Sequence, residues 1–394
     1  MNIPKLRFKE FTDEWKQTPL KNIIYSNIIE APKPTTDYIR LGIRSHCKGT
    51  FHELVKIENI LSADKMYIVP KNNLILNITF AWEQAIAITD DNDEGKYISN
   101  RFPTFAFKDN QLPTFYKYII PQKRLKYDLN VASPGGAGRN RVLNKKLFLS
   151  IPVNIPLLKE QEKIAKFLTT VDKKITNLEN IITSLENQKK GLLQQIFSQK
   201  LRFKDKNGNN YPNWEKKKLG DITTSYSGGT PSVNVKDYYN GTIPFIKSGE
   251  IHNSFTETFI TETGLNSSSA KLVKKGDLLF ALYGATSGDT SISKINGAIN
   301  QAILCVRSTT LNLHYLYQLL NFYRNKLLSI YLQGGQGNFS ATIFKNLIFN
   351  FPCLEEQTKI ADFLSAFDRK LENQKAQLEH WQQIKKGLLQ QMFV

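Results

Sequence analysis

The chain has 394 residues, of which 41% are apolar, so two or more folded domains are expected, each with a real core. Its formal net charge of +18 suits a polyanionic partner such as nucleic acid, although basic charge alone does not separate this class from other basic proteins. The three cysteines lie far apart and give no zinc motif or disulfide framework, and no signal peptide or long apolar run is present, which predicts a cytoplasmic protein without a membrane span.

The first part of the chain, residues 1–155, predicts one mixed α/β domain with a net charge of +8. A helix is expected at 113–120, and a glycine loop, GGAGRNRV, closes the region at 135–142. Short β-type runs separated by turn residues predict strands at 38–43, 73–78, 85–89 and 104–107.

Five side chains of this region are candidates for contact with nucleic acid. In the glycine loop, Arg139, Asn140 and Arg141 could donate hydrogen bonds to phosphates and base edges. The alternative is a flexible turn without a ligand, since the loop lacks the GxxxxGK[ST] pattern of a nucleotide site. Arg40 and Arg44 lie four residues apart on an expected strand and would share one face, which is either solvated or in contact with DNA.

A long amphipathic helix is expected within residues 156–200, with Pro156 at its start. Apolar residues recur there by alternating steps of four and three, which is the 3.5-residue period of a coiled coil. At 1.5 Å per residue, the stretch 160–198 would be roughly 58 Å long. The seam is interrupted by one lysine, Lys189, and it consists of Ile164, Leu168, Val171, Ile175, Leu178, Ile182, Leu185, Lys189, Leu192 and Ile196.

The second globular region, residues 201–351, also predicts a mixed α/β domain. A helix is expected at 315–332, and strands are expected at 243–247, 277–282, 290–292 and 302–306. The runs YIRLGIR and IPFIKSG are equivalent in the two regions, and so are VPKNNLILNI and VKKGDLLFAL. A second glycine loop, GGQGNFSAT, follows at 334–342. The nucleic-acid candidates of this region, with the same alternatives as in the first, are Lys247, Ser248, Gln333, Gln336, Asn338 and Ser340.

The last segment, residues 352–394, repeats the first helix with an offset of 196 positions and no gap. PLLKEQEKIAKFL returns as PCLEEQTKIADFL, and KKGLLQQIF returns as KKGLLQQMF. The second copy has its own seam lysine, Lys385, at the position that matches Lys189. A shorter repeat, LRFK followed by a tryptophan and a leucine, opens each globular region.

Two copies with matching seams favour pairing of the helices with each other over packing of each helix on its own domain. The expected fold is therefore two mixed α/β domains joined by an antiparallel two-helix coiled coil, with a pseudo-two-fold repeat. Its four segments would be 1–155, 156–200, 201–351 and 352–394. The residues expected to serve helix pairing or partner binding are Ile164, Leu168, Ile175, Ile182, Leu364, Leu371, Leu378 and Trp381.

This combination resembles the specificity (S) subunit of type I restriction–modification enzymes. The resemblance rests on the repeated helix motifs, the KKGLLQQ endings, the LRFK entries and YSGGTPS…YYNGTIPFIKSGEI at 226–251, and it extends over essentially the whole chain. The first globular region departs from the family pattern, because NIIEAPKPTTDYIRLGIR stands where SGGTP is expected. That departure puts the DNA contacts of the first region in more doubt than those of the second.

The resemblance implies that each globular region is a target-recognition domain that recognises one half of a bipartite, asymmetric site in double-stranded DNA. It implies that the helices set the spacer and bind two methyltransferase (M) subunits, which restriction (R) subunits join. Adenine methylation and cleavage would belong to those partners, together with S-adenosylmethionine, ATP and Mg²⁺. This chain would hold no cofactor and no metal and would not be an enzyme.

The residues support the absence of catalysis independently, because the chain has no PP dipeptide of the adenine methyltransferase motif and its five histidines are scattered. Two other hypotheses remain. One is a self-sufficient restriction–methylation enzyme, which a methylation assay of the chain alone would detect. The other is a coiled-coil RNA-binding protein, which competition between duplex DNA and structured RNA would detect.

Overall fold

The computed structural model describes residues 3–59, 65–135, 141–331 and 339–393. The chain divides into two compact units, of which unit 1 comprises Met1–Leu178 with Gln377–Val394, and unit 2 comprises Glu179–Ala376. Each unit therefore contains one globular region and a segment of each long helix. The four-segment division expected from sequence stays a prediction, because each compact unit contains parts of both long helices and does not end where a helix begins.

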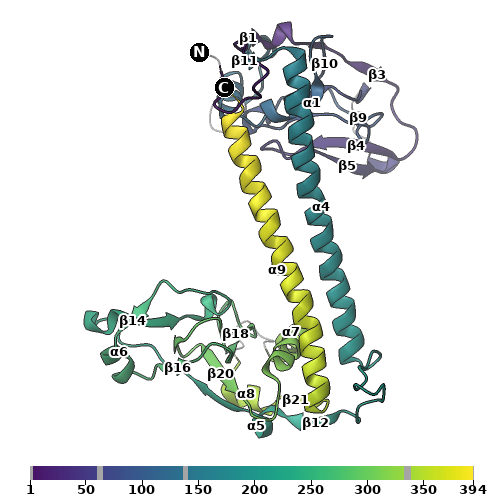
Figure 1. The fold of residues 1–394 in the computed structure, drawn as a ribbon. Helices are drawn as coiled ribbons and strands as arrows, with labels where there is room; N and C mark the ends of the chain where they lie inside the picture. The colour runs from purple at the N-terminus through teal and green to yellow at the C-terminus, as the bar shows by residue number, and fades with distance from the viewer. Residues whose placement is uncertain (1–2, 60–64, 136–140, 332–338, 394) are drawn as a thin grey trace. The chain divides into compact units, whose positions relative to one another are not determined.

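Unit 1 contains three small sheets (Figure 1). Neighbouring strands are antiparallel except for the parallel pair β4 and β9. The two-stranded sheet pairs β1 (Lys16–Pro19) with β11 (Pro152–Ile155). The inner sheet has the order β2 (Ile24–Ser26), β10 (Thr104–Phe107), β7 (Leu74–Leu76) and β8 (Ile86–Ile88). The outer sheet has the order β3 (Ile29–Ala31), β6 (Met66–Ile68), β9 (Tyr97–Ile98), β4 (Tyr38–Ile43) and β5 (Thr50–Val55).

The helices of unit 1 cover the inner sheet and complete its core. Trp15, Phe105 and Phe115 are buried there, and Leu168 from one long helix and Phe393, two residues after the end of the other, pack into the same cluster. Apolar burial of this kind is the main stabilising term in folding, so both long helices stabilise the globular region that they enter. The short helices are α1 (Pro113–Ile119), α2 (Lys123–Val131) and α3 (Lys145–Ser150), with 3-10 turns at Leu20–Asn22, Ile57–Asn59 and Ala81–Glu83.

Unit 2 has the same plan. Its parallel pair is β14 and β19, which matches β4 and β9 of unit 1. The two-stranded sheet pairs β12 (Glu215–Lys218), which contains three consecutive lysines, with β21 (Ile348–Phe351). The inner sheet has the order β13 (Thr224–Ser227), β20 (Ile303–Arg307), β17 (Leu278–Ala281) and β18 (Thr290–Ile292). The outer sheet has the order β15 (Phe259–Ile260), β14 (Tyr239–Ile246), β19 (Gly297–Ile299) and β16 (Lys271–Val273).

The core of unit 2 repeats that of unit 1. Ile196 and Phe197 from the first long helix and Leu364 from the second pack with Phe280 and Tyr315 of the globular region. The helices here are α5 (Leu219–Ile222), α6 (Glu262–Asn266), α7 (Leu313–Tyr331) and α8 (Ala341–Asn346), with 3-10 turns at Lys236–Tyr238 and Ser248–Glu250. The strands and the two helices expected in the globular regions are confirmed, with ends that differ by a few residues.

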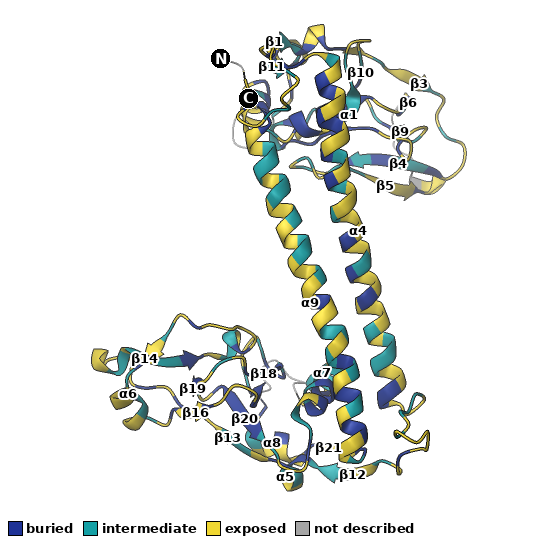
Figure 2. Cartoon of the chain, viewed as in Figure 1, coloured by how far each residue is buried: buried dark blue, intermediate teal, exposed yellow. Residues whose placement is uncertain are grey.

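The two long helices are α4 (Leu158–Phe197) and α9 (Leu354–Gln391). They pack together, and within each unit their segments run antiparallel, because the start of one helix lies beside the end of the other. Figure 2 shows buried and half-buried positions along both helices, and every expected seam residue of the two copies falls in one of these two classes. The expected antiparallel coiled coil is confirmed.

Candidate nucleic-acid interface

Each unit anchors its globular region to the start of a long helix through one buried glutamate. In unit 1, Arg7 donates two hydrogen bonds of 2.8 Å to Glu160, and the Trp15 indole N–H donates to the same carboxylate at 3.2 Å. Glu160 is buried, and its hydrogen bond with Arg7 raises the pKa of that guanidinium. Two parallel hydrogen bonds fix the orientation of the arginine as well as its charge.

Unit 2 contains the same anchor. Arg202 donates two hydrogen bonds of 2.8 Å to Glu356, and Trp214 donates to Glu356 at 3.1 Å. The LRFK…W repeat therefore supplies the arginine and the tryptophan of each anchor, and the repeated helix supplies the glutamate. Sequence analysis found both halves of this pattern but not their contact.

A buried glutamine beside each anchor ties the helix to the globular region a second time. The Gln161 side-chain oxygen accepts from the Leu112 N–H at 3.0 Å, and that of Gln357 accepts from the Asn312 N–H at 3.0 Å. Leu112 precedes α1, and Asn312 precedes α7. The frame that presents each candidate interface is thus held by the same polar contacts in both units.

The described residues at the end of each glycine-rich segment make matching backbone contacts. Just after the first loop, the Leu143 N–H donates to the Ile78 carbonyl at 2.9 Å, and within the second loop the Phe339 N–H donates to the Leu282 carbonyl at 2.8 Å. Ile78 and Leu282 follow β7 and β17, which match in the two inner sheets. Leu143 and Phe339 are thus tied to matching points of the two inner sheets. Several candidates lie outside the described residues, namely Arg139, Asn140, Gln333, Gln336 and Asn338.

Arg141 closes the described end of the first loop. Its guanidinium donates to the carbonyls of Ser133 at 3.0 Å and Asn130 at 2.7 Å, and its Cζ lies 5.0 Å from the centre of the Trp82 ring. A cation over an indole face is attractive, and this contact places Trp82 beside the loop. Arg141 holds the loop through these contacts, in addition to any that it makes with DNA.

Arg40 and Arg44 both contact the β5 side of the outer sheet. Arg40 donates to Glu53 at 2.7 Å, its partner in the strand register, and Arg44 donates to the Thr50 carbonyl with its Cζ 5.0 Å from the centre of the Phe51 ring. Arg40 is half-buried on β4, whereas Arg44 is exposed and directly follows that strand, which ends at Ile43. The ion pair with Glu53 offsets the charge of Arg40.

The described candidates of unit 2 lie at turns. Lys247 is exposed and begins a 3-10 turn that includes Ser248, and its N–H donates to Glu250 at 3.1 Å. Ser340 caps α8, since its hydroxyl accepts from the Ile343 N–H at 3.1 Å. Lys247 thus keeps an ammonium group at the surface, whereas the hydroxyl of Ser340 serves a structural role.

Steric crowding in unit 2 explains why the SGGTP motif contains two glycines. A Cβ on Gly228 would lie 1.8 Å from the Ile299 carbonyl oxygen, and a Cβ on Gly229 would lie 2.5 Å from the Ser269 side chain. Only glycine permits this approach of the backbone to β19 and to the residues before β16. In unit 1, the corresponding segment forms the additional edge strand β3 and contains no such glycine pair.

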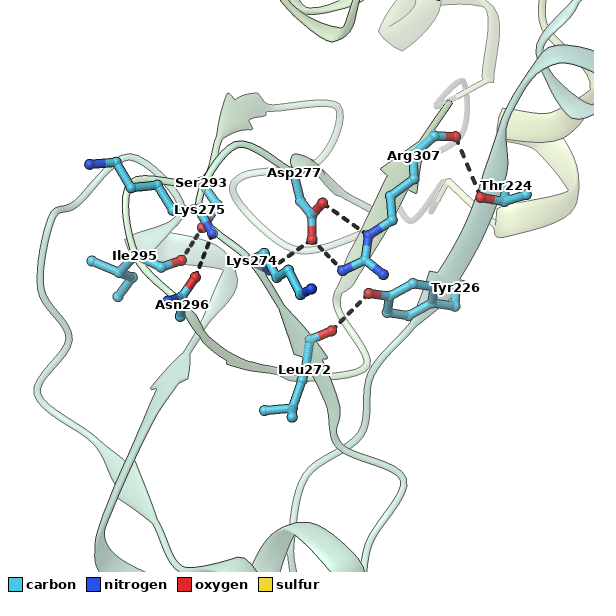
Figure 3. A network of polar contacts seen from close by, with 10 residues as sticks. All are labelled: Thr224, Tyr226, Leu272, Lys274, Lys275, Asp277, Ser293, Ile295, Asn296 and Arg307. Atoms are coloured by element: carbon cyan, nitrogen blue, oxygen red, sulfur yellow. Dashed lines mark hydrogen bonds and ion pairs between the residues drawn. The ribbon is translucent and has the colours of Figure 1, made fainter. Parts of the chain in front are cut away.

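An ion pair joins the strands of the inner sheet of unit 2, as Figure 3 shows. Arg307 on β20 donates to Asp277 at 2.9 Å, and the Lys274 N–H donates to the same carboxylate at 2.8 Å. Burial alone would raise the pKa of Asp277, but these hydrogen bonds outweigh it and lower the pKa below its usual value. The guanidinium also lies 5.4 Å from the Tyr226 ring centre, and the Tyr226 hydroxyl donates to the Leu272 carbonyl at 2.7 Å.

Exposed lysines gather beside this network. None of the ammonium groups of Lys271, Lys274, Lys275 and Lys294 is in an ion pair with another described residue. In unit 1, by contrast, Lys71 lies 3.7 Å from both Asp91 and Glu94. Lysines without carboxylate partners suit phosphate contact. Three of these lysines lie within 271–275, and Lys294 joins them only through the fold.

The described part of the chain contains no group of three or more histidines, cysteines or acidic residues that could hold a metal ion. Among the same residues, no helix combines the length and the apolarity needed to cross a bilayer.

Comparison with known proteins gives a family match over most of the chain. The family described as "Type I restriction modification DNA specificity domain" matches twice, at residues 17–187 and 211–380. Each match begins in a globular region and ends within one of the long helices.

Individual relatives agree with this match. The MjaVIII type I restriction enzyme specificity subunit of Methanocaldococcus jannaschii is 25% identical over 377 residues, which cover 91% of this chain and 84% of that protein. The MjaIX specificity subunit of the same organism is 31% identical over 193 residues, and that match spans only 44% of its length. The crystal structure of a type I restriction–modification S subunit from M. genitalium has the same fold, with a TM-score of 0.65, 14% identity, and coverage of 100% of this chain and 99% of that one.

Proposed function

The chain belongs to the type I restriction modification DNA specificity domain family, and from that premise we propose that it is the subunit that selects the DNA site for a type I restriction–modification complex. Each globular region recognises one half of a bipartite, asymmetric target in duplex DNA. Phosphate contacts give affinity, and base-edge contacts from the loops give sequence preference.

One observation carries this proposal: two globular regions with the same plan and the same helix anchors differ in the polar residues of their glycine-rich segments. The glycine loops follow α2 and α7 along the chain. Arg139 and Arg141 belong to the first loop, whereas Gln333 directly precedes the second loop and Gln336 belongs to it. A protein that recognises two different half-sites needs this combination of a shared frame and unlike contact residues.

The chain acts without catalysing a reaction. Methyl transfer and DNA cleavage are reactions of partner subunits, two methyltransferase (M) subunits and restriction (R) subunits, which hold the S-adenosylmethionine, ATP and Mg²⁺. The paired helices set the separation of the half-sites and provide the partner-binding surface. Support comes from the lengths of α4 and α9, 40 and 38 residues, which correspond to about 60 Å at 1.5 Å per residue.

A reconstitution assay tests the proposal against its alternatives. A type I M subunit is mixed with duplex DNA and S-adenosylmethionine, with and without this chain, and adenine methylation is measured. We expect methylation only when both proteins are present and inhibition by competing duplex DNA rather than by structured RNA. Methylation by the chain alone would indicate a self-sufficient enzyme, and preferential competition by RNA would indicate an RNA-binding protein.

A further inference from the structure

Lysines interrupt the apolar seam of both long helices, and the structure gives each of them an acidic partner on the other helix. In unit 1, the Lys385 ammonium on α9 lies 2.7 Å from an oxygen of Asp172 on α4. In unit 2, the Lys189 ammonium on α4 pairs with Asp368 on α9. Both pairs obey the 196-residue offset of the repeat, because Asp172 matches Asp368 and Lys189 matches Lys385.

Each aspartate also contacts a helix of the globular region with its second oxygen. The Tyr118 hydroxyl on α1 donates to Asp172 at 2.9 Å, and the Gln318 side-chain amide on α7 donates to Asp368 at 2.6 Å. Tyr118 and Gln318 are themselves buried, with 4% and 1% of their surface exposed. Each carboxylate therefore joins three helices, two from the coiled coil and one from the globular region.

A gain in folding stability does not by itself explain why these lysine–aspartate ion pairs occupy the helix seam. Apolar residues of similar volume usually stabilise a helix seam as well as a partly buried ion pair does, because burial removes both charges from water. A polar residue at a seam position is known instead to specify register. If α9 moved by one heptad, Lys189 would face Lys375 in one direction and the buried Ala361 in the other, and each arrangement leaves its charge without a partner.

We propose that Asp172 and Asp368, with their lysine partners, are positioning residues for DNA recognition: each fixes the register of the helix pair and the seating of the adjoining recognition domain on it. The inference rests on the proposed function, because it says how the two recognition domains are held for a target with one spacer. We call the two three-helix junctions, Tyr118–Asp172–Lys385 and Gln318–Asp368–Lys189, the carboxylate junctions.

Charge reversal separates the two roles of a carboxylate junction. In the two-site variant Asp172→Lys, Lys189→Asp, both helix pairs become like-charged. In the four-site variant, Asp368→Lys and Lys385→Asp are added, so the helix ion pairs return with opposite polarity. In the four-site variant, Tyr118 and Gln318 both face a lysine instead of a carboxylate, so both lose the hydrogen bond that they donate to the aspartate.

A second pair of variants breaks only the domain contact. Tyr118→Phe removes one hydroxyl, and Gln318→Met removes one amide while keeping a similar volume, so both helix ion pairs remain. The matched control reverses an outer ion pair of the same two helices, Glu186→Lys with Lys375→Glu, in which both side chains are about half exposed and the oxygen–nitrogen distance is 2.6 Å.

The measurements are thermal unfolding of the chain and methylome sequencing of cells that express it with its M subunit. We expect the two-site variant to unfold at lower temperature than the wild type and the four-site variant to recover most of the loss. The four-site and the Tyr118→Phe, Gln318→Met variants should methylate the wild-type target about tenfold more slowly, which is the size of one hydrogen bond to a charged group. They should also methylate targets whose spacer differs by about one base pair, or about 3.4 Å.

Two results would overturn the inference. The first is a four-site variant that unfolds no later than the two-site variant, because the ion pairs would then not fix the helix register. The second is a Tyr118→Phe, Gln318→Met variant with the wild-type rate and spacer, because the junctions would then not position the domains. If the wild-type chain itself gives no methylated motif, the proposed function fails instead, and the unfolding comparison still decides the register role.

Discussion

The anchors of the two units are alike, whereas their outer sheets differ. The Arg7–Glu160 and Arg202–Glu356 contacts have the same distances, and in each unit the tryptophan donates to the glutamate of its own anchor. The outer sheets differ, since unit 1 has the added strand β3 where unit 2 has the glycine pair Gly228 and Gly229. The parts that meet the long helices are the same in both units, whereas the parts that face away from them are free to diverge.

Breaking an anchor should have the largest effect. Glu356→Ala leaves Arg202 and the Trp214 N–H without their acceptor in a buried site, which typically costs about 3 kcal/mol. We expect a clearly lower unfolding temperature by differential scanning calorimetry, and a similar loss for Glu160→Ala in unit 1. Glu30→Ala is the control, because it breaks an exposed pair with Lys65. Equal unfolding temperatures for Glu356→Ala and Glu30→Ala would show that the anchors are not structural.

A change in the glycine pair should affect unit 2 alone. Gly228→Ala places a Cβ against the Ile299 carbonyl, so the backbone must move, at a cost of about 2 kcal/mol. Hydrogen exchange should increase in β14, β19 and β16 and stay unchanged in the outer sheet of unit 1. Gly249→Ala is the control, since nothing lies within 4 Å of its added Cβ. Unchanged exchange in Gly228→Ala would contradict the steric role of SGGTP.

A substitution of Arg141 tests whether the two recognition domains act separately. Arg141→Lys keeps the charge but loses the planar contact with Trp82 and the two carbonyl hydrogen bonds, which should cost about 1 kcal/mol. We expect relaxed preference at one half of the methylated target and no change at the other. Equal relaxation at both halves would mean that the loops do not act on separate half-sites.

The smallest effect concerns acid stability. The pKa of Asp277 is lowered on folding, so its contribution is present above its unfolded pKa of about 3.8 and is lost as pH falls through the lower folded value. Asp277→Asn should therefore reduce the loss of stability below pH 4, as seen in urea unfolding at a series of pH values. The exposed Asp237→Asn is the control, and the same acid slope in wild type and Asp277→Asn would contradict the assignment.

Sequence patterns predicted the elements better than the contacts between them. The period of the long helices located their seam, because burial on one face imposes it locally. The same pattern showed Lys189 and Lys385 as interruptions but not their partners, since Asp172 and Asp368 lie one position outside the seam. The contact of Arg7 with Glu160 joins residues 153 positions apart, so no local pattern contains it. The contact of Trp82 with Arg141 joins residues 59 positions apart, so it also depends on the tertiary fold.

The most direct test of the account is a methylome of a host that expresses this chain with its M subunit. The account predicts one methylated motif with two specified parts of different sequence, separated by an unspecified spacer of a single length. A continuous motif, a motif with two identical parts, or a spacer of variable length in the wild type would contradict the idea that the paired helices hold two unlike recognition domains.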